Sequence, residues 1–499
     1  MWLELSARAY LAEGDGTHLS AVSDLVVAPL GGGPALLVSD RAEGAVSAFA
    51  LGPGGSLVPL AAIAGHAALA AVEDLTLLPF PDGLRLGVAG RGAEGSATYD
   101  LTTGTLLSQH ETLSGPLWSG LETAAVTPGG NRTLLVAAQR GTPGLEVHQL
   151  ANNGKLAPLH SIPDTPDLPL GDVTALAVWD GKNDLIYAAS AFDAGIAAFT
   201  VKRTGELLVE SVVEPGPKAA FGRITALEFV EAGALGYLVA ADAATGSLLL
   251  FKARPGGKLK HLSTVSDGAE TAIAGATEIA GFTGADGKPY VAVSGAEGGV
   301  SIFLIDALPR IDRLKHVGTA ADDPFDPMGP VGALTVTTLS GETIVAVGSA
   351  AGHGLRTHAL TLTRPEVEVI GGRGDDALQG TGVDELLYGS HGADVIRGGG
   401  GDDLLIDGRA SDTLTGGAGA DVFELWPDDA TEEITDFELG LDRIDLSAFP
   451  RLHGLSGLEI NPRSFGANVF VGAEKLVLRS ADGATLEAAD LAEDVFIFL

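Results

Sequence analysis

The sequence predicts an all-β protein made of a seven-bladed β-propeller, a parallel β-roll and a C-terminal β cap. An apolar strand motif recurs about every 50 residues, and each unit holds four short strands without a helical period. From Gly371 onward, nine-residue repeats rich in glycine and aspartate follow one another without an insertion. The expected boundaries are 1–365 for the propeller, 366–424 for the roll and 425–499 for the cap.

The first strand of each expected blade is an apolar run with a polar beginning. Seven such runs align, namely "VSDLVVAP", "VEDLTLLP", "LETAAVTP", "VTALAVWD", "ITALEFVE", "ATEIAGFT" and "VGALTVTT", which start at Val22, Val72, Leu121, Val173, Ile224, Ala276 and Val331. A second apolar run, a glycine-containing turn, a third run such as "GSLLLFKA" and, in most units, a fourth run follow. Four strands in a unit of about 50 residues are typical of a propeller blade.

The seventh unit ends after its third strand, "RTHALTLT", while the chain begins with an unassigned strand, "WLELSARAYL". We therefore predict that the N-terminal strand completes the seventh blade. Such a closure joins the two ends of the ring and leaves no long unpaired edge between the first and last blades.

The 50-residue unit, with third strands of the form G-x-v-x-x-F, resembles the seven-bladed lactonase-like propellers, a superfamily that includes 6-phosphogluconolactonase. The resemblance covers roughly residues 1–365 and rests on the blade pattern. The sequence shows no Ser-His-Asp order, G-x-S-x-G elbow, phosphate loop or H-E-x-x-H motif. Because propellers serve as hydrolases and as pure binding scaffolds, the fold leaves both functions open.

The first strands of all blades line the central channel of a propeller, where side chains of different blades can meet. Five carboxylates near the start of these strands form a candidate channel site: Asp24, Glu73, Asp74, Glu122 and Glu278. Converging carboxylates could hold a hard cation or polarise a bound substrate. The alternative is that these acids are solvated strand ends, since strand alternation sends the neighbours Glu73 and Asp74 to opposite faces.

The nine-residue repeats are "GGRGDDALQ", "GTGVDELLY", "GSHGADVIR", "GGGGDDLLI", "DGRASDTLT" and "GGAGADVFE". They fit the frame G-G-x-G-x-D-x-U-x, in which U is apolar. This frame is similar to the repeat of RTX proteins, a secreted calcium-binding family whose repeats wind into a parallel β-roll. The resemblance implies that each repeat makes half a turn and that calcium sits between repeats n and n+2.

The residue types suit calcium on their own terms. Glycine lets a tight turn aim carbonyl oxygens inward, and aspartate adds charged oxygens, which together supply the roughly six oxygen ligands that Ca²⁺ prefers. The expected ligands are Asp376, Glu385, Asp394, Asp403, Asp412 and Asp421 at position six, and the leading glycines Gly371, Gly389, Gly398 and Gly416. The apolar column at position eight is the expected core of the roll: Leu378, Leu387, Ile396, Leu405, Leu414 and Phe423.

The expected calcium sites are not equal. Val383 replaces glycine and Glu385 replaces aspartate in the second repeat, while Asp407 and Ala410 replace glycines in the fifth. The intact pairings join repeat one with three and repeat four with six. We expect these two sites to be occupied first, and the pairings of two with four and three with five to be weaker or empty.

The stretch "EITDFELGLDRIDLSAF" at 433–449 is similar to the cap that follows the repeats in serralysin-like proteins. The chain ends in "LAEDVFIFL", an acidic and then apolar tail similar to C-terminal type I secretion signals. The N-terminus lacks a basic region, a continuous apolar run and an A-x-A site, so no Sec signal is expected. The resemblance implies export by type I secretion machinery to the outside or the cell surface of a Gram-negative bacterium.

Composition limits the partners. Lys+Arg 30 against Asp+Glu 65 gives a net charge of −35, which argues against nucleic acid and favours cations. The absence of cysteine excludes disulfides and thiolate zinc sites, and no apolar run predicts a transmembrane segment. We expect a secreted calcium-binding protein whose propeller is a binding or surface-interaction scaffold for an unknown extracellular or cell-surface ligand. The alternative is a lactonase-like or other hydrolase with its active site at the channel.

Overall fold

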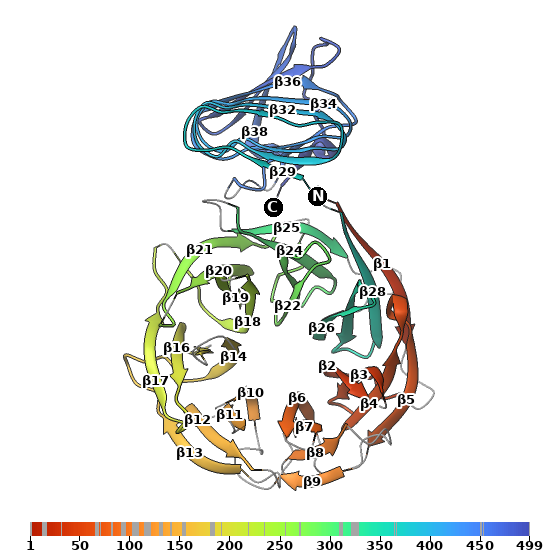
Figure 1. Cartoon of the computed structure of the whole chain (residues 1–499), viewed down its shortest axis with the longest axis vertical. Coiled ribbons are helices and arrows are strands. Elements are labelled where there is room, and N and C mark those ends of the chain that lie inside the picture. The colour runs from red at the N-terminus through yellow and green to blue at the C-terminus, as the bar shows by residue number, and fades with distance from the viewer. Residues whose placement is uncertain are drawn as a thin grey trace.

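The computed structural model describes the chain between Trp2 and Phe498 with short gaps. The residues outside the description are 1, 12–16, 31, 65–68, 70, 81–82, 91–95, 102–108, 114–120, 129–132, 140–141, 152–155, 180–184, 191, 218, 234, 255, 269–270, 309–312, 321–328, 364, 366, 450–451, 453 and 499. Strands dominate the described part, which forms a ring of sheets and a separate roll (Figure 1). The predicted fold class, an all-β chain with a seven-bladed propeller and a parallel roll, is confirmed.

The ring consists of seven four-stranded antiparallel sheets. In chain order the blades are β2 (Val22–Leu30) to β5 (Leu57–Ala64), β6 (Val72–Phe80) to β9 (Gln109–Leu113), β10 (Leu121–Pro128) to β13 (Leu156–Ile162), β14 (Val173–Trp179) to β17 (Leu207–Val213), β18 (Ile224–Ala232) to β21 (Leu259–Ser266), β22 (Glu278–Thr283) to β25 (Arg313–Ala320), and β26 (Val331–Leu339) to β28 (Leu355–Thr363). Their second and third strands are β3 (Gly33–Asp40), β4 (Ala45–Leu51), β7 (Gly83–Gly90), β8 (Ser96–Asp100), β11 (Thr133–Gln139), β12 (Thr142–Leu150), β15 (Leu185–Ser190), β16 (Gly195–Val201), β19 (Leu235–Asp242), β20 (Ser247–Ala253), β23 (Pro289–Ser294), β24 (Val300–Asp306) and, in blade seven, β27 (Glu342–Ser349).

The N-terminal strand β1 (Trp2–Leu11) is the fourth strand of blade seven. It pairs antiparallel with β28, from Trp2 opposite Thr363 to Leu11 opposite Leu355, with one register shift between Ala7 and Ala9. The last blade therefore contains strands from both ends of the propeller sequence, and the ring is closed by backbone hydrogen bonds.

An aromatic residue in the third strand anchors most blades. Five of these side chains are at most 1% exposed: Phe49, Tyr99, Phe199, Phe251 and Phe303. They pack in separate clusters that join one blade to a neighbour, so each blade contacts mainly the blades beside it. Burial of such a side chain stabilises a fold by roughly 1.5–3 kcal/mol, which explains the repeated phenylalanine of the third-strand pattern.

The roll consists of two parallel sheets built from alternating repeats. The propeller-facing sheet has the order β29 (Val367–Ile370), β31 (Glu385–Tyr388), β33 (Leu404–Ile406), β35 (Val422–Glu424), β37 (Arg443–Asp445) and β41 (Phe496–Ile497). The outer sheet has the order β30 (Ala377–Gln379), β32 (Val395–Gly400), β34 (Thr413–Ala418), β36 (Thr431–Phe437), β40 (Glu474–Ser480), β39 (Gly466–Val471) and β38 (Leu458–Arg463).

The register inside the repeats is 18 residues. Leu386 pairs with Leu404, and Ile396 pairs with Leu414, so each nonapeptide makes half a turn. Every position-eight side chain is buried in one core that also includes residues of the cap. Parallel pairing then continues into the segment after residue 424, where Thr413 pairs with Glu433 and Val422 with Arg443, at offsets of 20 and 21 residues.

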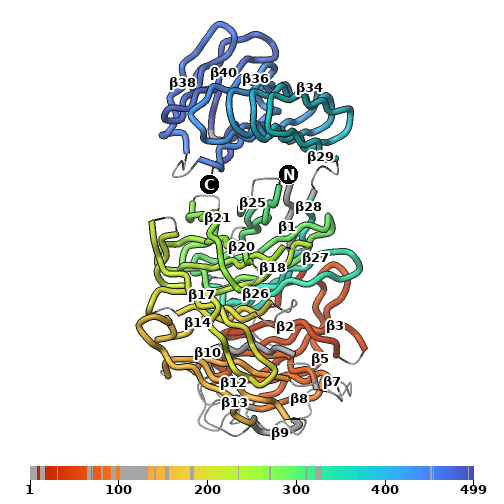
Figure 2. The backbone as a smooth tube through the Cα atoms, turned by 60° about the vertical axis from the view of Figure 1, so that its left-hand side comes forward, coloured from red at the N-terminus to blue at the C-terminus, as the bar shows by residue number. Residues whose placement is uncertain are grey.

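The roll lies beside the edge of the ring at blade six (Figures 1 and 2). Positions seven and nine of the even repeats face outward from the propeller-facing sheet and are apolar in most cases. Leu308, which follows β24, packs in one cluster with Leu386, Tyr388, Leu404, Ile406 and Val422. The same positions of the odd repeats include Gln379, Arg397 and Thr415, which lie on the outer sheet and are not buried. The two-residue alternation of the strand thus gives the roll a core side and a docking side.

Candidate metal centre

Position six of the nonapeptide directs a carboxylate into the roll at the start of each short strand. Five of the six residues are at most 2% exposed: Glu385, Asp394, Asp403, Asp412 and Asp421. Asp376, in the first repeat, is half-buried. The short spacing between the carboxylate and the apolar residue two positions later fixes both side chains, because the strand begins between them. The carboxylates therefore form one ladder along each edge of the roll.

In four of these residues one carboxylate oxygen accepts a hydrogen bond from the neighbouring turn. The backbone N–H of Asp376 donates to Oδ1 of Asp394 at 2.7 Å, and the N–H of Glu385 donates to Oδ1 of Asp403 at 2.8 Å. The same bond joins Asp394 to Asp412 at 2.6 Å and Asp403 to Asp421 at 2.9 Å. This hydrogen bond orients the carboxylate and leaves its second oxygen for another partner.

The second oxygen has no hydrogen-bond partner among the described residues. This holds for Oδ2 of Asp394, Asp403, Asp412 and Asp421 and for Oε2 of Glu385, all of which are buried. A buried anionic oxygen without a partner costs several kilocalories per mole, and a hard cation would remove that cost. The donor set is oxygen alone, as Ca²⁺ requires.

The leading glycines make room for these oxygens. A Cβ atom at Gly398 would collide with Oδ2 of Asp403, and a Cβ at Gly416 would collide with Oδ2 of Asp421. At Gly371 and Gly389 a Cβ would collide with the backbone carbonyl of the residue 18 positions later. The glycines thus bring carboxylate and carbonyl oxygens close together, as a calcium cradle requires.

Burial and neighbouring charges raise the pKa values of four ladder carboxylates. Burial is the largest cause for each residue, and carboxylates on adjacent turns add to it: the pKa of Asp394 is raised to about 6, that of Asp403 to about 7, that of Asp412 to about 8 and that of Asp421 to about 6. Without a cation Asp412 therefore favours its protonated form at neutral pH, and a divalent cation would displace this proton.

Position five explains the adjacent aspartates of the first and fourth repeats. Asp375 and Asp402 are exposed, and they point away from the ladder. Oδ1 of Asp375 accepts the backbone N–H of Ala393, and Oδ1 of Asp402 accepts that of Ala420, both at 2.8 Å. The side-by-side carboxylates therefore lie on opposite faces, and the position-five carboxylates bind backbone N–H groups of a neighbouring turn.

Sequence reasoning missed two further members of the ladder. Oε2 of Glu432 accepts the N–H of Asp412 at 2.7 Å, and Oδ1 of Asp442 accepts that of Asp421 at 3.0 Å. Both follow insertions of two or three residues, which break the nine-residue count. The carboxylate-x-apolar spacing survives in Glu432 and Ile434 and in Asp442 and Ile444, and this spacing could have identified them.

The carboxylates predicted to meet in the propeller channel do not form a comparable cluster among the described residues. Oδ2 of Asp24 accepts the backbone N–H of Leu75 at 2.7 Å and so joins blade one to blade two. Glu73 lies near Arg41, with 3.6 Å between Oε1 and Nη1. No three carboxylates among the described channel residues bring oxygens within 4.8 Å of one another. The side chain of Glu122 lies outside the described residues.

Three of the channel carboxylates nevertheless influence one another. Burial raises the pKa of Asp24 well above its ordinary value, and the charge of Asp74 raises it further. Burial, and then the charge of Asp24, raises the pKa of Glu278. Burial also raises the pKa of Asp74. The polar residues Thr174 and Thr225, at equivalent positions, donate to the carbonyls of Ile224 and Ala276 in the next blade. Hydrogen bonding between blades is thus a shared use of these positions.

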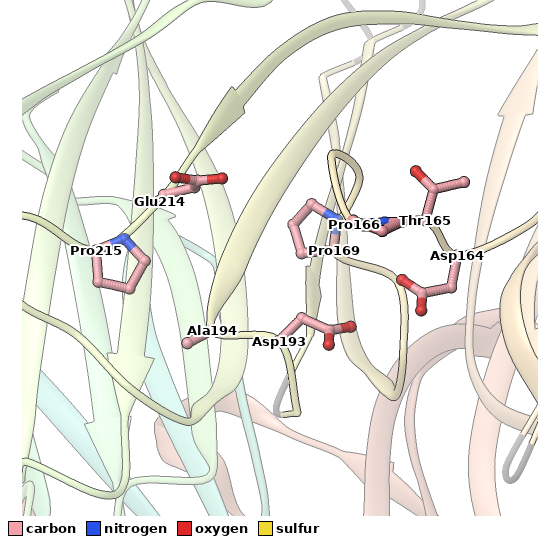
Figure 3. A pocket seen from close by; sticks show the side chains of 8 residues that line it. All are labelled: Asp164, Thr165, Pro166, Pro169, Asp193, Ala194, Glu214 and Pro215. Carbon is pink, nitrogen blue, oxygen red and sulfur yellow. The ribbon is translucent and has the colours of Figure 1, made fainter.

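A separate hollow lies at blade four (Figure 3). Its volume is about 600 Å³, and it is lined by Asp164, Thr165, Pro166, Pro169, Asp193, Ala194, Glu214 and Pro215. Asp164 and Asp193 accept the backbone N–H groups of Leu170 and Gly171, at 2.8 and 2.5 Å, and so fix the loop that forms one wall. The hollow is therefore acidic. Phe192, which directly precedes Asp193, is 81% exposed.

Comparison with protein families identifies the ladder. The model of the RTX calcium-binding nonapeptide repeat matches residues 370–405 and 398–428. The chain carries RTX calcium-binding repeats. These repeats bind calcium, and they form the roll described above, so the predicted RTX protein with a propeller is confirmed.

Solved structures resemble the propeller at low identity. A protein from Lactobacillus plantarum is 13% identical with a TM-score of 0.46, and the match covers 62% of this chain and 87% of that one. BBS1N in complex with ARL6DN, from a crystal soaked with lead, is 14% identical with a TM-score of 0.47 and covers 71% of this chain and 98% of that one. A comparison with curated proteins gives no significant match. Among the described residues, no helix has the length and apolar character needed to cross a membrane.

Proposed function

We propose that the RTX roll holds calcium through its position-six carboxylates and through carbonyl oxygens of the glycine turns. The observation that carries this proposal is the column of buried carboxylate oxygens without a hydrogen-bond partner in the described structure. The repeat pairings with intact glycines, through Asp376 with Asp394 and through Asp403 with Asp421, are the strongest nonapeptide sites. Asp394→Asn and Asp421→Asn should each lower the number of calcium ions bound per chain, as measured by calorimetric titration of the full chain. Unchanged stoichiometry in both variants would contradict the assignment.

We also propose that the protein is exported by type I secretion machinery and acts outside a Gram-negative cell. RTX repeats and the acidic, then apolar, C-terminal tail support this proposal. In the folded roll the tail contributes β41, which pairs with β37, and Phe496 is fully buried. The tail is thus accessible to secretion machinery only before the roll folds. Removal of residues 490–499 should abolish export from a cell that carries such machinery, while a Lys202→Gln substitution should leave export unchanged.

For the propeller, we propose a binding scaffold that recognises a cationic peptide at the acidic hollow of blade four. Glu214 is exposed at its wall, the exposed Phe192 directly precedes the lining residue Asp193, and the net charge of −35 favours positively charged partners. A carboxylate next to an exposed aromatic ring suits an ammonium or guanidinium group, which the ring attracts through its face.

A lysine-rich decapeptide is the probe for this role. The wild-type chain should bind it in low salt and release it as the ionic strength rises. Glu214→Gln and Phe192→Ala should each weaken binding about fivefold or more. Glu297→Gln, at the exposed hairpin between β23 and β24 in blade six, is the matched control and should bind as the wild type does. A chain that binds a glutamate-rich decapeptide equally well would rule out cationic recognition.

A hydrolase with its site at the channel is the second candidate. The observation that favours it is the set of raised pKa values at Asp24, Asp74 and Glu278, because a carboxylic acid with a raised pKa can serve as a general acid. A set of lactones and esters tested with the wild type and with Glu278→Gln distinguishes the candidates. Turnover that is lost in Glu278→Gln would establish the enzyme, while no turnover by the wild type would favour the binding scaffold.

A further inference from the structure

The fifth nonapeptide departs from the frame at its first position, where Asp407 stands in place of glycine. Asp407 directly follows β33 and is 1% exposed. Its Oδ1 accepts the backbone N–H of Gly408 at 2.5 Å and that of Trp426 at 3.0 Å. These bonds hold the carboxylate of Asp407 inside the roll. The nonapeptide frame has glycine at this position and so does not account for a carboxylate here.

Three buried carboxylates from different segments meet at this position. Asp407, Asp412 and Glu432 each offer one oxygen, and these oxygens lie within 4.8 Å of one another. The exposed fractions of Asp412 and Glu432 are 2% and 1%. Asp407 and Asp412 belong to the fifth repeat, whereas Glu432 belongs to β36, beyond the end of the nonapeptides. The group therefore joins the repeats to the cap.

Two oxygens of this group have no other use in the described structure. Oδ2 of Asp412 and Oε1 of Glu432 are buried without a hydrogen-bond partner there, while the second oxygen of Glu432 accepts the N–H of Asp412. The ion pairs of the described residues include none of the three carboxylates. Burial and the charge of Glu432 raise the pKa of Asp407 well above its ordinary value. Three buried anions at this separation need a cation to stay ionised together.

We propose that Asp407, Asp412 and Glu432 form a calcium site of their own, with three carboxylate ligands, at the junction of the repeats and the cap. This site differs from the nonapeptide sites, where glycine stands at the position of Asp407 and a carbonyl oxygen takes the place of its carboxylate. A higher charge count raises the affinity of an oxygen cage for Ca²⁺. The site is therefore filled at lower calcium concentration than the nonapeptide sites. The proposal is independent of the role of the propeller.

A neighbouring group extends the junction. Asp428, Glu432 and Glu474 each offer one carboxylate oxygen, and these oxygens lie within 4.8 Å of one another. Glu474 also accepts the backbone N–H groups of Asp428, Asp429 and Ala430 at 2.8–3.0 Å. These bonds fix the loop between β35 and β36, and Glu432 lies at its end. A cation bound to Glu432 would therefore tie the repeats to β40 of the cap. The role of the site would be structural, because the cation would hold the repeats and the cap in register after the two-residue insertion.

The test uses the full chain, Ca²⁺ and the variant Asp407→Asn. Asparagine keeps the size of the side chain and one oxygen to accept the N–H groups of Gly408 and Trp426, but it removes the charge. The matched control is Asp402→Asn, which removes one charge from an exposed position-five aspartate of the preceding repeat. In calorimetric titration the wild type should show one ion of highest affinity. Asp407→Asn should weaken that ion about tenfold or more, and Asp402→Asn should leave it within about twofold.

Terbium gives a second readout that does not depend on calorimetry. Tb³⁺ replaces Ca²⁺ at oxygen sites and emits when a nearby tryptophan is excited, and the backbone of Trp426 is bonded to Asp407. The first equivalent of Tb³⁺ should give sensitised emission, which Asp407→Asn reduces. Trp426→Phe should reduce the emission but retain the tight calcium ion. Equal calcium affinity and equal emission in Asp407→Asn and the wild type would overturn the proposal.

The variant Asp407→Gly decides the case if the asparagine variant does not fold. This substitution restores the nonapeptide frame. If Asp407 merely weakened the site of the fifth repeat, Asp407→Gly should bind calcium more tightly than the wild type. On the proposal it loses the ion of highest affinity, even though it matches the frame better. Tighter binding in Asp407→Gly would therefore also overturn the proposal.

Discussion

Arg313 of blade six and Glu424 of the roll form a buried ion pair between the propeller and the roll. Glu424 is fully buried and also accepts Lys315, while Lys315 Nζ lies 3.2 Å from Oδ2 of Asp445. The guanidinium of Arg313 stacks on the ring of Trp426 at 5.1 Å. Since the N–H of Trp426 donates to Asp407, one short path of contacts leads from the proposed calcium site to blade six.

Without the negative charge of Glu424, the roll and the propeller should unfold in separate transitions. Glu424→Gln leaves two cations buried without their main partner, and breaking a buried pair in this way costs about 3–5 kcal/mol. We expect the roll to detach and to unfold at lower temperature than the propeller, as seen by differential scanning calorimetry of the calcium-loaded chain. The control is Glu206→Gln at the exposed pair with Lys202, which should leave the melting curve close to that of the wild type. Equal melting curves for both variants would contradict a stabilising interface.

The interface should weaken in acid. Burial alone would raise the pKa of Glu424, but the charges of Arg313 and Lys315 outweigh it and lower the pKa from 4.5 to about 2. A carboxylate whose pKa is lowered by folding stabilises the folded state when the pH is above the ordinary pKa. This stability is lost as the pH falls from about 5 toward 2. The stability difference between the wild type and Glu424→Gln should therefore shrink in this range, as measured by urea unfolding at fixed calcium. A difference that grows on acidification would refute the assignment.

The strand β1 should be needed for a closed ring. It pairs with β28 along its whole length, and no covalent bond replaces these contacts. Deletion of residues 1–11 exposes the edge of β28 and removes one of four strands from blade seven, so the melting temperature of the propeller should fall clearly. A chain with Tyr10→Ala, which loses only the contact of that ring with Arg356, should melt close to the wild type. An unchanged melting temperature after the deletion would show that closure by β1 is dispensable.

The sequence predicts the fold well because both architectures repeat. The blade period and the nine-residue frame locate the strands, and the position-eight column correctly identifies the core from Leu378 to Phe423. The continuation of the ladder through Glu432 and Asp442 is less visible, because insertions in the turns shift the count while the carboxylate-x-apolar spacing persists.

The contacts between non-neighbouring segments are not visible in the sequence. Arg313 and Glu424 are 111 positions apart, and no periodicity relates them. The apolar residues at positions seven and nine of the even repeats, such as Leu386 and Leu404, do carry a signal, since the odd repeats are more polar at these positions. The role of the channel carboxylates is not visible in the sequence either. Hydrogen bonds such as that from the N–H of Leu75 to Asp24 show that polar residues at a blade start can join neighbouring blades.

Calcium removal should unfold the roll and free the C-terminal tail while the propeller stays folded. Burial, and then repulsion between neighbouring carboxylates, makes ionisation of the ladder costly, as the raised pKa values of Asp403 and Asp412 show. Because folded carboxylates such as Asp412, with a pKa of about 8, bind protons that the unfolded chain releases, the stability of the calcium-free roll falls as the pH rises from about 4 to 8.

Hydrogen exchange of the full chain at pH 8 should therefore show loss of protection over 367–445 and 496–497 after addition of a chelator, and recovery in millimolar Ca²⁺. The strands of blade three are the internal control, because they lie on the far side of the ring from the roll and should keep their protection throughout (Figure 1). A roll that stays protected in chelator at pH 8 would show that the fold does not depend on the ion, and loss of protection in blade three would show that calcium stabilises the whole chain.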